Sequence, residues 1–168
     1  MTCDMYLDLG LKDIIKILGE KDCKRLAHTS YSTDGIEIPS DLSYNSDGDL
    51  YHDFDIYYGK VSEKSLPSLL YFQGGGLFMR LRRFLRSFVF LLLRGGGNVV
   101  NINYRLLPRV TLKIHVDDVL DGIIYIYEKS IRLNVNPRKI FLASDSAGSL
   151  LSLAALAFGY VFPTTVYT

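Results

Sequence analysis

The chain has 168 residues, 48% of them apolar, with 19 basic and 18 acidic residues and a formal net charge of +1. This length suits one domain with a sizeable core, and the apolar fraction excludes a disordered chain. A charge so close to neutral gives no global field for nucleic acid or an anionic membrane. The longest uninterrupted apolar run, residues 88–93, is far shorter than the roughly 20 residues of a membrane helix. These properties predict a soluble protein with no transmembrane segment and no nucleic-acid partner.

The cysteines and the N-terminal charges predict the compartment. Cys3 and Cys23 form no Cys-x-x-Cys pair, so we expect free thiols in a reducing environment. Asp4 and Asp8 interrupt the N-terminal apolar stretch, which argues against a secretory signal. A cytoplasmic location is therefore predicted.

The N-terminal part of the chain, residues 1–48, is expected to form an irregular segment. Apolar residues recur with helical spacing over 4–18, whereas residues 29–48 are polar and rich in turn formers. Short strands are predicted over 36–38 and 54–58.

The remaining residues, 49–168, alternate between strand and helix patterns. The strands are expected at 68–72, 99–103 and 140–143, and the helices at 77–92, 116–131 and 147–158. Such alternation is typical of an α/β fold with a mostly parallel sheet, right-handed crossovers and helices on both faces.

The segment 144–148 follows a predicted strand and opens a predicted helix. It nearly fits the Gly-x-Ser-x-Gly nucleophile elbow, in which a sharp strand-to-helix turn exposes a serine, here Ser146. The flanking residues at the ±2 positions, Ser144 and Gly148, are small, as a tight turn requires. The alternative is an ordinary helix N-cap, because serine and aspartate are favoured there.

A second turn of small residues, Gly74–Gly76, follows the strand at 68–72. Backbone N–H groups in such a loop can bind an oxyanion. The alternatives are a flexible turn or a phosphate loop at a helix N-terminus. Neither Gly-Lys-Ser/Thr nor Gly-x-Gly-x-x-Gly is present, so a nucleotide site is disfavoured and no cofactor is predicted.

The chain contains three histidines, His28, His52 and His115, and all of them precede the elbow serine. His115 starts a helix close to Asp117 and Asp118, a string that could suggest metal ligands. Consecutive helical residues point in different directions, however, so a polar helix start is favoured and no metal site is predicted. The other two histidines lie in polar, loop-like sequence without ligand spacing, and no histidine is expected to reach the serine.

Basic residues crowd one predicted helix, and most of them lie opposite its apolar stripe. They are Arg80, Arg82, Arg83, Arg86 and Arg94. We expect the solvated face of a covering helix; the alternative is a surface for nucleic acid or lipid headgroups.

Taken together, residues 73–76, 99–108, Asp118 and 136–148 resemble the hormone-sensitive-lipase-like branch of the α/β-hydrolases. That family contains esterases, lipases and arylacetamide deacetylase-like enzymes. The resemblance covers about residues 50–160 and implies the N-terminal half of an α/β-hydrolase fold, with 49–168 as a partial hydrolase domain. It also implies that residues 1–48 are cap-like, because in the family such a segment often contributes to a cap over the pocket.

The resemblance also implies roles for individual residues. Ser146 would be the nucleophile, and the N–H groups of Gly75, Gly76 and Ala147 would form the oxyanion hole. Asp118 would be structural. The implied reaction is acyl transfer from a small-molecule ester with an apolar acyl or aryl group, without a metal or cofactor.

The sequence departs from the family pattern at three places. Gln73 replaces the histidine that precedes the three glycines, and Ser144 and Ser149 replace glycines around the elbow. In this fold the acid and the histidine of the triad follow the nucleophile, and the 22 residues after Ser146 contain no histidine. Because a serine without a base is a poor nucleophile, we expect impaired or absent activity in this chain.

Two other possibilities follow from that departure. The chain could be a non-catalytic remnant or binding module that keeps the hydrolase fold. The strand at 140–143 could also present an unpaired apolar edge through which copies of the chain associate.

Overall fold

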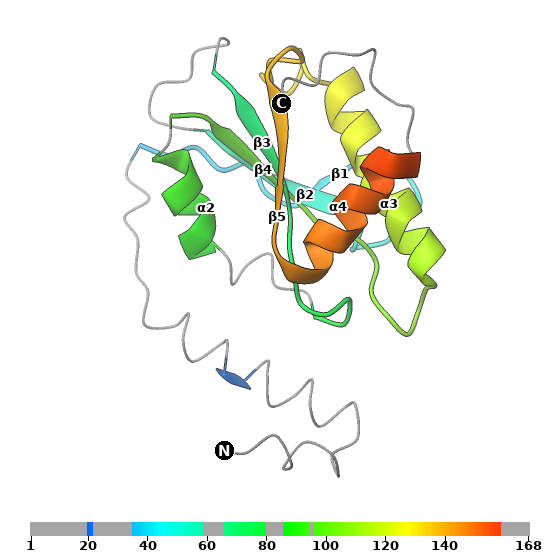
Figure 1. The fold of residues 1–168 in the computed structure, drawn as a ribbon. Coiled ribbons are helices and arrows are strands. Elements are labelled where there is room, and N and C mark those ends of the chain that lie inside the picture. The colour runs from blue at the N-terminus through cyan, green and yellow to red at the C-terminus, as the bar shows by residue number, and fades with distance from the viewer. Residues whose placement is uncertain (1–19, 22–34, 59–65, 80–85, 95, 159–168) are drawn as a thin grey trace.

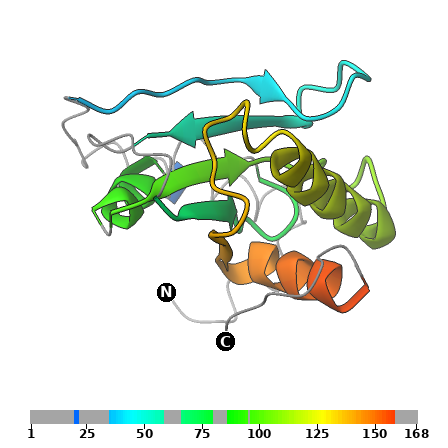
Figure 2. The ribbon, with the colours of Figure 1, turned by 90° about the horizontal axis from the view of Figure 1, so that it is seen from above.

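The computed structural model describes residues 20–21, 35–58, 66–79, 86–94 and 96–158 (Figure 1). These residues form a mixed sheet of five strands with helices on both of its faces (Figures 1 and 2). None of the helices in the described part combines the length and hydropathy that a membrane span requires.

The strands follow one another across the sheet in the order β1-β2-β4-β3-β5. Their bounds are Leu42–Ser43 for β1, Asp53–Tyr57 for β2, Ser68–Phe72 for β3, Asn98–Ile102 for β4 and Ile140–Ser144 for β5. β3 pairs in parallel with both β4 and β5, whereas β2 pairs antiparallel with β1 and β4. The three strands that alternate with helices are therefore the parallel part of the sheet, as the sequence predicts.

The described helices that cover the sheet are α2 (Arg86–Leu93), α3 (Leu112–Glu128) and α4 (Ser146–Phe158). Because side chains alternate along a strand, β3 serves two cores. Leu70 and Phe72 pack in the core that includes α3 and α4, while Tyr71 packs with α2 on the other face (Figure 2).

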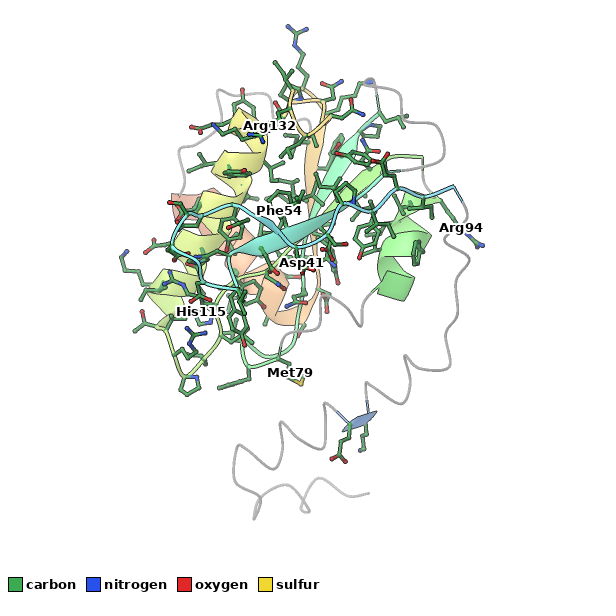
Figure 3. The ribbon with its side chains drawn as sticks, turned by 180° about the vertical axis from the view of Figure 1, so that it is seen from behind. Asp41, Phe54, Met79, Arg94, His115 and Arg132 are labelled. Atoms are coloured by element: carbon green, nitrogen blue, oxygen red, sulfur yellow. The ribbon has the colours of Figure 1, made fainter. Side chains whose placement is uncertain are left out.

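Buried side chains fill the space between the sheet and the helices (Figure 3). Phe54 of β2, for example, lies with its ring centroid 5.9 Å from that of Tyr125 of α3. At about 25 cal/mol per Å² of buried apolar surface, such aromatic contacts are a major source of stability.

The observed elements lie close to the predicted ones in the parallel part of the sheet. β3 spans the predicted 68–72, while β4 begins one residue before the predicted 99–103. β5 extends one residue beyond the predicted 140–143, and α4 begins one residue before the predicted 147–158.

The prediction that a helix begins at Leu77 is wrong. Gly76–Phe78 form a turn, in which Leu77 has φ +68°. The carbonyl of Gly75 accepts the N–H groups of Phe78 and Met79 at 3.1 Å. A left-handed residue cannot continue a right-handed helix, although its side chain keeps the apolar spacing.

Two other predictions near the N-terminus differ from the structure. The strand expected at 36–38 is reduced to a single bridge between Glu37 and Tyr58. The helix expected over 4–18 lies outside the described residues, as do both cysteines and three of the clustered arginines. The division of the chain at residue 48 stays a prediction.

Candidate active site

The candidate site begins where β5 turns into α4. β5 ends at Ser144 and α4 begins at Ser146, so a single residue separates strand from helix. Ser146 is exposed and has φ +47°, a left-handed conformation that is rare outside glycine. Holding a serine there costs about 1–3 kcal/mol, and such backbone strain is concentrated at functional sites.

Close packing explains the glycine two residues after the serine. A Cβ atom at Gly148 would overlap the carbonyl oxygen of Phe72 and lie 2.7 Å from that of Gln73. Only glycine lets the first turn of α4 approach the end of β3 so closely. The turn at Ser146 is thus built against the neighbouring strand.

The glycine loop lies directly beside the serine. A Cβ at Gly74 would be 3.0 Å from the Cβ of Ser146 and 2.5 Å from Oδ2 of Asp145. The N–H of Gly74 donates to Oδ1 of Asp145 at 2.8 Å, and the hydroxyl of Tyr71 donates to the same oxygen at 2.5 Å. Burial and the Asp145 carboxylate raise the pKa of Tyr71, so its hydroxyl stays a donor. Asp145 therefore fastens the glycine loop to the elbow.

The two glycines after Gly74 adopt conformations that favour glycine. Gly75 has φ +115° and Gly76 has φ +61°. Within the described part of the chain, the N–H groups of Gly75, Gly76 and Ala147 donate to no protein acceptor. The structure thus places the start of the glycine loop beside Ser146, and three predicted backbone donors have no protein partner among the described residues.

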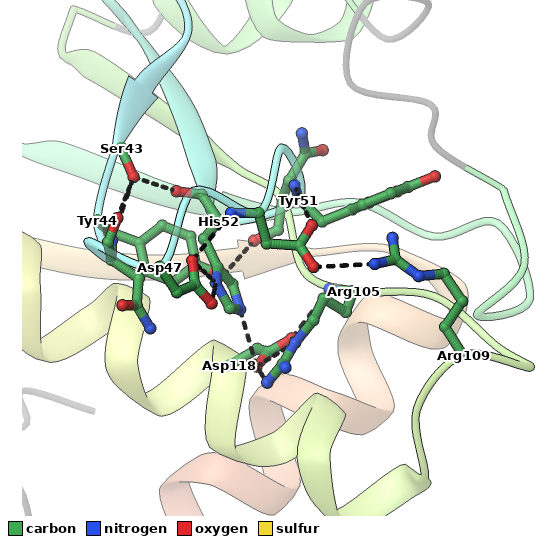
Figure 4. A network of polar contacts seen from close by, with 11 residues as sticks. Ser43, Tyr44, Asp47, Tyr51, His52, Arg105, Arg109 and Asp118 are labelled. Carbon is green, nitrogen blue, oxygen red and sulfur yellow. Dashed lines mark hydrogen bonds and ion pairs between the residues drawn. The ribbon is translucent and has the colours of Figure 1, made fainter.

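The histidines that the structure describes are engaged elsewhere. His52 is 1% exposed and lies between two carboxylates, with Nδ1 2.9 Å from Oδ1 of Asp47 and Nε2 3.3 Å from Oδ1 of Asp118 (Figure 4). Asp118 also accepts the N–H of Arg105 at 2.9 Å and its Nε–H at 3.0 Å. Sequence reasoning missed this cluster because it put His52 in a polar loop.

His115 does not form a site with its neighbouring aspartates. It is buried, and Nδ1 lies 2.8 Å from the carbonyl oxygen of Thr111, one turn earlier. Asp117 pairs with Lys113 at the surface, while Asp118 points inward. No group of metal-ligating side chains occurs among the described residues. His28 lies outside those residues, and neither His52 nor His115 is hydrogen-bonded to the elbow serine.

Known families and proteins match this arrangement. The family model described as BD-FAE matches residues 54–160. Among curated proteins, an AB hydrolase superfamily protein of Schizosaccharomyces pombe is 33% identical over 92 residues, which are 54% of this chain and 27% of that protein. Tuliposide A-converting enzyme 2 of Tulipa gesneriana is 31% identical over 99 residues, 52% of this chain and 26% of that enzyme.

Solved structures share the fold at lower sequence identity. Esterase B from Lactobacillus rhamnosis superposes with a TM-score of 0.79 at 21% identity, over 86% of this chain and 47% of that protein. A bacterial heroin esterase gives a TM-score of 0.74 at 24% identity, over 88% of this chain and 46% of that protein. The chain therefore spans about a quarter of its curated relatives and about half of these solved structures.

Proposed function

The chain belongs to the BD-FAE family and has the fold of α/β-hydrolase esterases, and we propose that it acts on carboxylic esters through Ser146. The observation that carries this proposal is the left-handed backbone of Ser146 beside the glycine loop. That strain exposes the hydroxyl at the end of the sheet, where an ester carbonyl can approach it.

In the proposed reaction the Ser146 oxygen attacks the ester carbonyl, and the carbonyl oxygen becomes an oxyanion. The N–H groups of Gly75, Gly76 and Ala147 would bind that oxyanion. They have no acceptor in the part of the protein that the structure describes, and the first turn of a helix favours negative charge. The alcohol then leaves, and water hydrolyses the acyl-enzyme. Removing one such donor typically slows catalysis by about 10²–10³.

Attack requires a group that accepts the serine proton. Both ring nitrogens of His52 face carboxylates, and Nε2 of His115 is buried without a partner and makes no hydrogen bond to Ser146, so this base is to be sought outside the described residues. Without a base, only the residual rate from the oxyanion hole and binding is expected.

We propose an ester with an apolar acyl or aryl group as substrate. Leu77, Phe78 and Met79 directly follow the glycine loop in the sequence and are only half buried, which supports apolar contacts with a substrate bound at that loop. The esterases named among the structural relatives support the ester class.

A fluorophosphonate probe tests the nucleophile. We expect covalent labelling of the full chain at Ser146, located by peptide mass spectrometry and lost in Ser146→Ala. Ser149→Ala is the matched control, because it removes a nearby serine hydroxyl from the same helix and should leave labelling unchanged. A folded chain that stays unlabelled would favour the second candidate, a non-catalytic binding module. That candidate is supported by the hydrogen bonds of His52 and His115 to groups other than Ser146.

We also propose that copies of the chain associate through the edge of the sheet at β5. Among the described strands β5 pairs on one side only, and its residue Phe141 is 48% exposed. Leu150, Leu153 and Leu156 continue this apolar surface along α4. Two copies related by a two-fold axis could pair their β5 edges antiparallel. A concentration-dependent mass in sedimentation experiments, reduced by Leu153→Lys, is expected; a monomer at all concentrations would contradict association.

A further inference from the structure

A chain of buried hydrogen bonds runs from the start of β2 to the base of the glycine loop. Its members are Asp53, Asn103 and Gln73, which are 6%, 0% and 0% exposed. Asn103 donates its side-chain amide to Oδ1 of Asp53, and its backbone N–H donates to the Asp53 carbonyl at 2.9 Å. Gln73 donates Nε2 to Oδ1 of Asn103 at 3.2 Å. Three segments that are far apart in sequence thus meet behind the loop.

The chemistry of the three side chains fixes which group donates and which accepts in each of these hydrogen bonds. A carboxylate can only accept hydrogen bonds, so the Asn103 amide must point its NH₂ group at Asp53. Its carbonyl oxygen then faces Gln73, which must turn its own NH₂ group toward Asn103. Asp53 therefore determines the orientation of the Gln73 amide through Asn103.

That orientation carries a cost at Gln73. Its Oε1 is buried and has no hydrogen-bond partner in the described part of the protein. An unsatisfied buried acceptor costs about 1–3 kcal/mol, and such groups often accompany function. An apolar residue at position 73 would remove this acceptor but would leave buried Oδ1 of Asn103 without the donor that Gln73 provides.

The residue so oriented is the one from which the glycine loop departs. The Gln73 carbonyl accepts the hydroxyl of Tyr104 at 2.7 Å, and the next N–H, that of Gly74, donates to Asp145 at 2.8 Å. The side chain, the carbonyl and the following amide are therefore each held by a different residue. Beyond this anchored point lie Gly75 and Gly76, whose N–H groups have no acceptor within the described ranges.

We propose that Asp53 and Asn103 are positioning residues for the glycine loop. They fix the Gln73 amide by the direction of their hydrogen bonds, and so set where the Gly75 and Gly76 N–H groups point. This inference rests on the proposed function for its catalytic meaning, but the position of the loop can be measured without any reaction.

Exchanging the carboxylate of Asp53 and the amide of Asn103 tests the direction of these hydrogen bonds. Asn103→Asp puts two carboxylates face to face and removes the donor to position 53. In the double variant Asp53→Asn/Asn103→Asp, the amide at position 53 donates to the carboxylate at position 103, which still accepts from Gln73. We expect the single variant Asn103→Asp to shift the amide resonances of Gly74–Gly76, and the double variant to restore them.

Gln73→Met separates positioning from stability and serves if Asn103→Asp fails to fold. It removes the unsatisfied Oε1 of Gln73 but leaves Oδ1 of Asn103 without its donor, so the number of unsatisfied acceptors is unchanged and the unfolding midpoint should change little. The amide hydrogen of Gly74, which is bonded to Asp145, should nevertheless exchange faster. Tyr44→Phe is the matched control. It removes a hydrogen bond to the Asn103 backbone carbonyl but leaves the hydrogen bonds between the Asp53, Asn103 and Gln73 side chains intact, so the loop resonances should stay in place.

Fluorophosphonate labelling distinguishes failure of this inference from failure of the proposed function. If the wild-type chain is labelled at Ser146, Asn103→Asp and Gln73→Met should slow labelling about tenfold or more, and the double variant should recover it. If the wild-type chain is not labelled, the proposed function fails, while the amide resonances still decide the positioning role. Unchanged loop resonances in Asn103→Asp or Gln73→Met, or no recovery in the double variant, would overturn it.

Discussion

The His52 cluster and the Ser146 turn are two polar regions with opposite designs. Around His52, Asp47, Asp118 and Arg105 pair charged and hydrogen-bonding groups in a largely buried setting (Figure 4). At Ser146 the backbone is left-handed, and the N–H groups of Gly75, Gly76 and Ala147 have no acceptor among the residues that the structure describes. Paired buried polar groups serve the fold, whereas strain and free donors are tolerated where a ligand can use them. The contrast separates a structural polar cluster from a candidate active site.

Breaking the structural cluster should have the largest effect on stability. Asp118→Ala leaves His52 buried without one of its partners and frees Arg105, so the free energy of unfolding should fall by about 3–5 kcal/mol. Asp117→Ala is the control, since it removes an exposed pair with Lys113 worth about 0.5 kcal/mol or less. Chemical denaturation measures both. Equal losses in the two variants would contradict the assignment of Asp118 as the centre of the cluster.

A methyl group at Gly148 should disturb the elbow by steric overlap. Gly148→Ala puts a Cβ against the Phe72 and Gln73 carbonyls, which should cost about 1–3 kcal/mol and displace the start of α4. Gly48→Ala also changes a glycine, one with positive φ but no atom near its Cβ, and should cost about 1 kcal/mol or less. Thermal unfolding compares the variants. A larger loss in Gly48→Ala would argue against close packing at Gly148.

Relieving the strain at Ser146 should stabilise the protein. Ser146→Gly lets a residue without a Cβ adopt φ +47°, so the free energy of unfolding should rise by about 1 kcal/mol while probe labelling is lost. Ser149→Gly is the control with the opposite expected effect, because glycine within α4 should lower the free energy of unfolding by about 0.5–1 kcal/mol. If both variants destabilise alike, the turn at Ser146 stores no strain.

The pH dependence of the structural cluster should be the smallest of these effects. Hydrogen bonds from His52 and the Asp49 backbone lower the pKa of Asp47 below 3.8. The unfolded chain therefore binds more protons in this range, so Asp47 contributes stability above about pH 4 that is lost as the pH falls through its lowered pKa. Asp47→Asn should flatten the acid side of a stability profile measured by denaturation between pH 2 and pH 6, roughly the range of carboxyl titration.

Asp121 offers a comparison of opposite sign. Burial and the carboxylates of Asp118 and Asp117 raise its pKa. Its ionised form costs stability above that raised pKa, and the cost disappears as the pH falls below it. Asp121→Asn should therefore stabilise the protein at neutral pH, whereas Asp47→Asn should not. The same sign for both variants would contradict these assignments.

The sequence predicts the local parts of this molecule best. β3 is a short apolar run between Pro67 and the glycines, so its ends are marked in the sequence, and the elbow has a motif of its own. The false helix start at Leu77 arose because apolar spacing describes side chains and carries no information on φ.

Non-local polar contacts are what the sequence does not reveal. His52 meets Asp118 across 66 positions, and Asn103 meets Asp53 across 50. A polar residue in a turn-rich segment and one destined for a buried network look alike until the sheet brings their partners together. Asn103, Tyr104 and Arg105 directly follow β4, and each of them bonds to another part of the fold. This run of polar residues after a buried strand is the sequence feature that indicates such contacts.

The hydrogen bond between Gly74 and Asp145 joins residues 71 positions apart, which has a consequence for how the site assembles during folding. Closing so long a loop costs chain entropy before any contact repays it, so contacts of this range form late. A peptide that contains only the elbow and α4 lacks the glycine loop and the Phe72 carbonyl against which the turn is packed. Reactivity at Ser146 would therefore appear in a refolding experiment only after β3 and β5 have paired, and a serine probe would time the completion of the sheet.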